Sequence, residues 1–151
     1  KEYYQKEIQA SSISISFKPS SEPLIIMADQ LQLGKVLMSM MQNCLHALHK
    51  KKQKTEFHAE MLIWLERQGD HVLIHLHDNG IGIEQSIMDK IFDPFFTTKT
   101  TSEAAGVGLY LSKEIILSHN GWVDVRSTKD EYTEFILSIP IHQSFKLSDH
   151  E

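Results

Sequence analysis

The sequence offers neither covalent cross-links nor a membrane anchor. Cys44 is the only cysteine, which excludes an internal disulfide and a cluster of thiolate metal ligands. No apolar run approaches the roughly 18 residues of a membrane-spanning helix, and the opening residues KEYYQKEIQA lack both a methionine and the pattern of a signal peptide. We therefore expect a cytoplasmic domain that is a piece of a longer protein.

Positive charge is also scarce. The formal net charge is -5, and the basic cluster runs only from Lys50 to Lys54, so neither nucleic acid nor an anionic membrane is an expected partner. What the chain does have is 151 residues with 41% hydrophobic content, which is enough for one compact core. We expect a linker remnant at 1–10, one domain at 11–141 and a tail at 142–151.

The hydrophobic pattern predicts a mixed sheet covered by helices. After Asp29, a candidate N-cap, apolar residues recur every three or four positions up to the lysine run, which indicates a long helix. Two shorter helices and six strands follow from the same criteria. The strands are expected at 11–17, 23–28, 60–67, 71–78, 122–127 and 133–140, and the shorter helices at 84–92 and 108–120. Residues 97–105 show no period and predict a loop. The fold class is therefore α+β, a two-layer α/β sandwich with a mixed sheet and helices on one face.

Asp78 ends a predicted apolar strand, where a carboxylate is unexpected. Alternate residues of a strand share a face, so Asp78 points to the same side as Ile74 and Leu76. A carboxylate on an apolar face needs hydrogen-bond donors from the protein or from a ligand. A structural role is the alternative, because Asp-Asn-Gly also suits a tight turn. Taken alone, the residue favours the turn.

Two pairs of glycines offer close approach to a ligand. Gly80 and Gly82 leave the backbone bare beside Asp78, so a flat group could come near it. Gly106 and Gly108 lie between the predicted loop and a helix, where free N–H groups and the helix dipole suit a phosphate. Lys99 lies in that loop and either folds over the phosphate or is an ordinary solvated lysine. Each glycine pair alone is a weak signal.

The long predicted helix carries a polar stripe beside its apolar row. Ser39, Asn43 and His46 follow each other at helical spacing. An amide oxygen such as that of Asn43 is a hard, neutral ligand that suits Mg²⁺ on phosphates, although an Asn inside an apolar helix is often a satisfied core amide. His46 and His49 could instead begin a zinc site, but no third ligand stands at a suitable spacing.

Four segments together resemble one family. MQNCLHAL resembles the N-box, DNGIGI the first glycine box, IFDPFFTTK the phenylalanine box and GVGLYLS the second glycine box of the histidine-kinase ATP-binding domain. That domain belongs to the superfamily that includes gyrase, chaperone and MutL ATPases. The order and spacing of the segments match, and the similarity extends from about Asp29 to Pro140. It implies the Bergerat ATP-binding fold, with ATP between the sheet and a lid.

The resemblance also implies roles for individual residues. Asp78 would accept a hydrogen bond from the adenine amino group. Asn43 would hold Mg²⁺ on the ATP phosphates and would in this way serve the catalytic step. The other nucleotide contacts would be Gly80, Gly82, Lys99, Gly106, Gly108 and Leu109, with Phe95 and Phe96 anchoring the lid.

Ser39 indicates the branch of the superfamily. Hydrolysing relatives place a Glu one turn before the metal-binding Asn, and this chain has Ser39 there. Serine is a poor base at neutral pH, which disfavours hydrolysis. A histidine acceptor needs less help, because neutral imidazole is already nucleophilic. Most histidine kinases carry Asn where Ser39 stands and Ala where Cys44 stands, and the size of Cys44 suits a core position.

We therefore expect the ATP-binding catalytic domain of a two-component sensor histidine kinase, using ATP and Mg²⁺. It would donate the γ-phosphoryl group to a histidine on a separate dimerisation domain, for later passage to a response regulator receiver domain. No histidine precedes His46, so the acceptor lies outside this chain; the fragment could be a monomer and the parent, which could be membrane-anchored, a homodimer. The alternative is an ATP-binding regulatory module of a degenerate kinase that transfers nothing.

Overall fold

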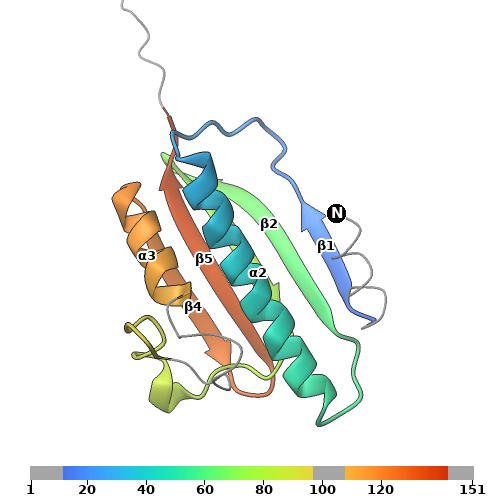
Figure 1. The fold of residues 1–151 in the computed structure, drawn as a ribbon. Helices are drawn as coiled ribbons and strands as arrows, with labels where there is room; N and C mark the ends of the chain where they lie inside the picture. Colours follow the sequence, from blue (N-terminus) through green and yellow to red (C-terminus); the bar gives the residue numbers. More distant parts are fainter. Residues whose placement is uncertain (1–11, 97–107, 143–151) are drawn as a thin grey trace, which may run out of the picture.

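A five-stranded mixed sheet with two helices on one face forms the framework of the molecule (Figure 1). The computed structural model describes residues 12–96 and 108–142. The strand order is β1-β2-β3-β5-β4; β1 runs parallel to β2, and the other neighbours are antiparallel. The elements are β1 (Ser14–Lys18), α2 (Gln30–Lys52), β2 (Glu60–Gln68), β3 (His71–Asp78), α3 (Gly108–Ser118), β4 (Trp122–Thr128) and β5 (Tyr132–Pro140). The expected α+β sandwich is confirmed.

Helix α2 begins and ends as its sequence predicts. The side chain of Asp29 accepts hydrogen bonds from the N–H groups of Leu31 and Gln32, which caps the first turn. Four positions along α2 are buried at intervals of four residues, so one stripe of the helix packs on the sheet. These residues are Val36, Met40, Cys44 and Leu48. Three lysines and a histidine fill the last turn, where positive charge is favourable.

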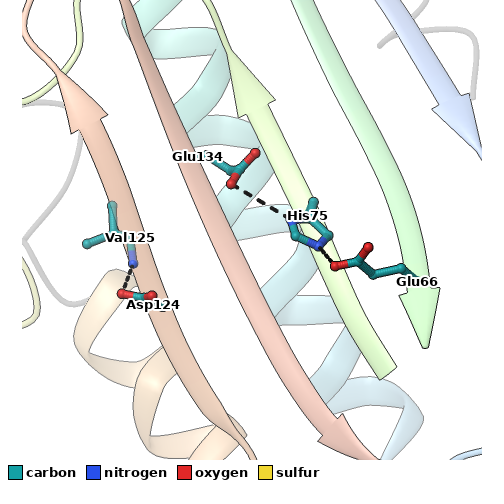
Figure 2. Close-up of polar contacts among 5 residues, drawn as sticks. All are labelled: Glu66, His75, Asp124, Val125 and Glu134. Carbon is teal, nitrogen blue, oxygen red and sulfur yellow. Dashed lines mark hydrogen bonds and ion pairs between the residues drawn. The ribbon is translucent and has the colours of Figure 1, made fainter. Parts of the chain in front are cut away.

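Strand β3 lies in the middle of the sheet and is buried on both faces. Its helix-facing residues Ile74, Leu76 and Asp78 belong to the face covered by α2 and α3. On the other face, no helix of the described ranges covers His75, yet only 7% of this residue is exposed. Figure 2 shows His75 between glutamates of the two neighbouring strands: Nε2 lies 2.9 Å from Glu66 Oε1 and Nδ1 lies 3.8 Å from Glu134 Oε2.

The predicted strand at 23–28 is wrong. This segment forms only an isolated bridge between Ile26 and Ile141, together with a hydrogen bond from the His142 N–H to the Ile25 carbonyl. Pro23 has no N–H to give to a ladder. The segment also has to return from the edge strand β1 to the start of α2, so only its middle meets the end of β5.

The predicted helix at 84–92 is also wrong in type. A single 3-10 turn covers Gln85–Ile87 and is followed by further turns. Glu84 at its start makes no side-chain capping bond, and Pro94 disfavours helical geometry at the residue before it. The apolar residues of this segment pack against the core without forming a helix, since Ile91 is buried there.

Other expectations fall outside the described ranges or stay open. The predicted loop at 97–105 lies outside the described residues. The predicted helix at 108–120 is present as α3. The division into a linker, a domain and a tail remains a prediction. Within the described residues, no helix has the length and apolar character to cross a membrane.

Candidate functional site

A cavity of about 550 Å³ lies between the helices and one end of the sheet. Its walls come from α2, from the loop that follows β3, from the first residues of α3 and from β5. This brings together sequence segments that are far apart in the chain. The predicted site residues on its wall are Ser39, Asn43, His46, Asp78, Gly82, Phe96, Gly108 and Leu109.

Asp78 is the chemically unusual group of this cavity. It is 1% exposed and accepts a hydrogen bond from the Gly80 N–H at 2.9 Å. Burial raises the pKa of its carboxyl from 3.8 to about 6, against the lowering effects of the Gly80 N–H, of a hydrogen bond with Cys44 and of the charge of Lys51. Burial, the neighbouring Asp78 charge and the hydrogen bond to Asp78 likewise raise the pKa of the Cys44 thiol. Asp78 therefore both accepts a hydrogen bond within its turn and lines the cavity.

The glycines beside Asp78 are required by close backbone packing. A Cβ at Gly80 would lie 2.6 Å from the carbonyl carbon of Ala47 on α2, and a Cβ at Gly82 would collide with the Thr128 carbonyl oxygen. Gly82 also has φ +67°, which disfavours any side chain. The glycine loop is thus held between α2 and the β4–β5 turn. Gly82 lines the cavity, whereas the predicted contact Gly80 is not among the residues that line it.

Asn79 holds this loop in place, a role that the sequence reasoning missed. Its Oδ1 accepts from the Glu60 N–H at 2.8 Å, and its Nδ2 donates to the His58 carbonyl at 2.8 Å. Lys51 donates from Nζ to the Asn79 carbonyl at 2.9 Å. An Asn directly after a strand was the available signal, because its side chain often replaces missing backbone partners.

Thr133 is a second residue that the sequence reasoning missed. It is 3% exposed, lines the cavity and is paired with Asp78 across β3 and β5. Its hydroxyl oxygen lies 2.9 Å from Ser127 Oγ. A polar residue at a helix-facing position of an otherwise apolar strand was the signal. Two polar side chains on adjacent strands therefore face the same end of the cavity.

The polar stripe on α2 does face the cavity. Ser39, Asn43 and His46 all line it, and a Cβ at Gly108 would lie 2.9 Å from Ser39 Oγ. The start of α3 therefore packs closely against the middle of α2. No group of three metal-ligating His, Cys, Asp or Glu side chains occurs in the described residues.

The two phenylalanines after the glycine loop lie differently. Phe96 lines the cavity, whereas Phe95 is 75% exposed and has φ +64°. The predicted phosphate contacts Lys99 and Gly106 lie outside the described residues. Of the two predicted lid anchors, only Phe96 thus lies on the cavity wall, and their role as anchors remains a prediction.

The sandwich and its cavity define an α+β domain with a candidate ligand site of about 550 Å³. Its sequence matches the family described as histidine kinase-, DNA gyrase B-, and HSP90-like ATPase over residues 28–143. The chain belongs to this family, as the four motifs predict.

Curated relatives at about one third identity are sensor kinases. The alginate biosynthesis sensor protein KinB of Pseudomonas aeruginosa is 33% identical over 133 residues, which are 88% of this chain and 21% of KinB. The signal transduction histidine-protein kinase AtoS of Escherichia coli is 35% identical over 117 residues, 78% of this chain and 18% of AtoS. The chain thus spans about a fifth of the length of these relatives.

Solved structures share the fold. The catalytic domain of the histidine kinase ThkA, in a nucleotide-free form, superimposes with a TM-score of 0.75 at 28% identity, covering 92% of this chain and 86% of that domain. Full-length ShkA in complex with AMPPNP gives a TM-score of 0.78 at 20% identity, covering 95% of this chain and 28% of ShkA. The second likeness shows the fold alone.

Proposed function

We propose that the chain is the ATP-binding catalytic domain of a two-component sensor histidine kinase. The observation that carries this proposal is the buried carboxylate of Asp78, which lines the same cavity of about 550 Å³ as Asn43 of α2. The names of the relatives support the same reading, since KinB and AtoS are sensor proteins of this kind.

Asp78 recognises the adenine ring in this proposal. A buried carboxylate with acceptor capacity to spare favours a ligand that brings an N–H donor, because an unsatisfied buried acceptor costs about 1–3 kcal/mol. The exocyclic amino group of adenine is such a donor. In this proposal Gly82 lines the cavity beside the adenine, and Gly80 holds the loop next to Asp78, where its N–H donates to the carboxylate.

Asn43 and Ser39 serve the phosphate end of the site. The residues fit Mg²⁺, because an amide oxygen is a hard ligand and Asn43 lines the cavity. Mg²⁺, when bound, would neutralise charge on the phosphates. Asn43 would hold the metal by its side-chain oxygen, and Ser39 would hydrogen-bond a water beside it. Gly108 and Leu109 contribute the start of α3, and Lys99 and Gly106 are the further proposed phosphate contacts.

The reaction is transfer of the γ-phosphoryl group to a histidine. The bond between the γ-phosphorus and the bridging oxygen breaks, a phosphorus–nitrogen bond forms with the imidazole, ADP leaves, and the imidazole proton passes to solvent. Ser39 stands where a base would activate water, and a serine does so poorly at neutral pH. The site is therefore built for positioning rather than for hydrolysis.

The rest of the reaction requires partners outside this chain. We infer a histidine-containing dimerisation domain in the parent protein, a homodimeric parent and a response regulator receiver domain that accepts the phosphoryl group. ATP as the donor places the domain on the cytoplasmic side, whether or not the parent is membrane-anchored. The isolated chain is expected to be a monomer.

A second function is favoured by the departure at Ser39. Most histidine kinases carry Asn there, and a degenerate kinase could keep ATP binding as a regulatory signal without transfer. Phosphorylation of the acceptor histidine in the parent, with labelled ATP, distinguishes the two. Label on the histidine supports the kinase, and saturable ATP binding without label supports the regulatory module.

Calorimetric titration with a non-hydrolysable ATP analogue and Mg²⁺ tests the ATP-binding step. We expect saturable binding by the wild-type chain and none by Asp78→Asn, whose amide group presents a donor where the adenine needs an acceptor. Asp124→Asn is the matched control, because Asp124 is exposed on the sheet face opposite the cavity. Equal binding by all three chains, or no binding by a folded wild type, would contradict the proposal.

A further inference from the structure

The peptide group that joins Asn79 to Gly80 has a hydrogen-bond partner at each end. Its N–H belongs to Gly80 and donates to Asp78 Oδ1 at 2.9 Å. Its C=O belongs to Asn79 and accepts from Lys51 Nζ at 2.9 Å. In a trans peptide the N–H and the C=O lie in one plane and point in opposite directions. The partner that holds the carbonyl therefore also sets the direction of the N–H that reaches the Asp78 carboxylate.

The Lys51 side chain is itself held in place at the end of α2. Its Nζ lies 4.6 Å from the centroid of the Phe57 ring, a distance at which the ring face attracts the ammonium group. Phe57 in turn packs against the hydrophobic core. One turn earlier on α2, the Ala47 carbonyl accepts from the Ile81 N–H at 3.3 Å. The end of α2 thus holds the turn after β3 at two points, once by backbone and once by a charged side chain.

The backbone of this turn does not fix the orientation of the peptide by itself. Glycine tolerates both signs of φ, so a peptide that precedes Gly80 has two accessible orientations, as in turns of types I and II. The Asn79 side chain binds the Glu60 N–H and the His58 carbonyl, which places the residue but leaves its own carbonyl to Lys51. A flipped peptide would turn the Gly80 N–H away from the carboxylate.

We propose that Lys51 is a positioning residue for nucleotide recognition: by holding the Asn79 carbonyl, it keeps the Gly80 N–H on Asp78 and so fixes the carboxylate that receives the adenine amino group. This inference rests on the proposed function. Lys51 is not among the residues that line the cavity, so it acts through the turn and not by touching the nucleotide.

The charge of Lys51 acts in the same direction as its hydrogen bond. Burial raises the pKa of Asp78, and the charge of Lys51 is one of the effects that oppose this rise. The register neighbours of Asp78 are Met61 on β2 and Thr133 on β5, which are uncharged. Loss of Lys51 should therefore loosen the carboxylate and also disfavour its charged form, which is the better acceptor.

Three substitutions at the end of α2 test the effect on affinity. We expect Lys51→Met to bind the non-hydrolysable ATP analogue with Mg²⁺ about 3- to 10-fold more weakly at pH 7, the effect of losing a modest hydrogen bond. Lys51→Arg keeps a charged donor and should recover most of this affinity. Lys50→Met is the matched control, because it removes the same charge from the same turn of α2, and it should bind like the wild type. Equal affinities of Lys51→Met and Lys50→Met would overturn the inference.

A measurement without nucleotide keeps the inference separate from the proposed function. In the wild type the amide proton of Gly80, followed by NMR across pH 4–8, should shift as Asp78 titrates, because it is bonded to that carboxylate. In Lys51→Met this shift should shrink and the Asp78 carboxyl carbon should titrate at a higher pH, while Lys50→Met behaves like the wild type. An unchanged Gly80 response in Lys51→Met would overturn the inference. Absence of analogue binding by the wild type would instead overturn the proposed function and with it the recognition role, whatever the amide shows.

Discussion

Asp78→Asn should make the ligand-free chain more stable while it abolishes nucleotide binding. Burial raises the pKa of Asp78 from 3.8 to about 6, and each pKa unit corresponds to about 1.4 kcal/mol. Well above pH 6 the buried charge therefore costs at most about 3 kcal/mol of folding free energy. Asparagine removes the charge and keeps an oxygen that can accept from the Gly80 N–H, so most of this cost should be recovered.

The pH dependence of this gain identifies its cause. The pKa of Asp78 is higher in the folded chain than in the unfolded chain, so the folded wild type takes up a proton first as the pH falls. Its stability relative to Asp78→Asn should therefore improve by about 2 kcal/mol between pH 8 and pH 4.5. Urea denaturation of both proteins without nucleotide, at several pH values in this range, measures the difference directly.

Two results would refute the reasoning. A stability difference that stays constant from pH 8 to pH 4.5 would mean that Asp78 does not titrate as a buried group. A variant that is less stable than the wild type at pH 8 would mean that the carboxylate contributes more to the fold than its burial costs. Asp124→Asn, at an exposed site on β4, should show neither effect and controls for the change in net charge.

Three further substitutions test contacts that hold the site together. Gly82→Ala should destabilise the chain by more than about 2 kcal/mol, because φ is +67° and its Cβ meets the Thr128 carbonyl; a wild-type urea midpoint would contradict the close packing of the loop. His119→Ala removes the Nε2 acceptor of the Asp29 N–H, at 3.0 Å, and should cost about 1 kcal/mol in urea denaturation, whereas no loss would mean that water replaces this bond. Asn79→Ala should lower both stability and affinity for the ATP analogue, since two side-chain bonds fix the loop, and unchanged affinity would separate the loop from the site.

The parts of the fold that the sequence predicted well are those in which local and tertiary signals agree. Helix α2 has a capping aspartate, a buried residue every fourth position and a basic last turn, so propensity and packing favour the same structure. The β2–β3 hairpin likewise has Gly69 at a positive φ between two apolar strands. At 23–28 the apolar run predicted a strand, but a strand also needs a partner, which the sequence of that segment does not reveal.

The site was predicted residue by residue only where chemistry left few choices. A carboxylate on an apolar face and glycines beside it indicated a ligand, and the cavity contains Asp78, Gly82 and Asn43. Asn79 was missed because its partners are backbone groups at the start of β2, which pattern reasoning does not place next to it. The burial of His75 on the open face was missed for a related reason: the glutamates that flank it come from β2 and β5 (Figure 2).

The proposed function gives the costly burial of Asp78 a reason. A carboxylate offers about four acceptor positions, and the Gly80 N–H donates to one of them. Burial nevertheless raises the pKa of Asp78 to about 6, because it outweighs the groups that lower this pKa. A fold selected for stability alone would add donors or replace the charge. Recognition of an amino group requires an acceptor that is fixed in position and has hydrogen-bonding capacity left. The amino group of the ligand then donates the hydrogen bond that the protein does not provide.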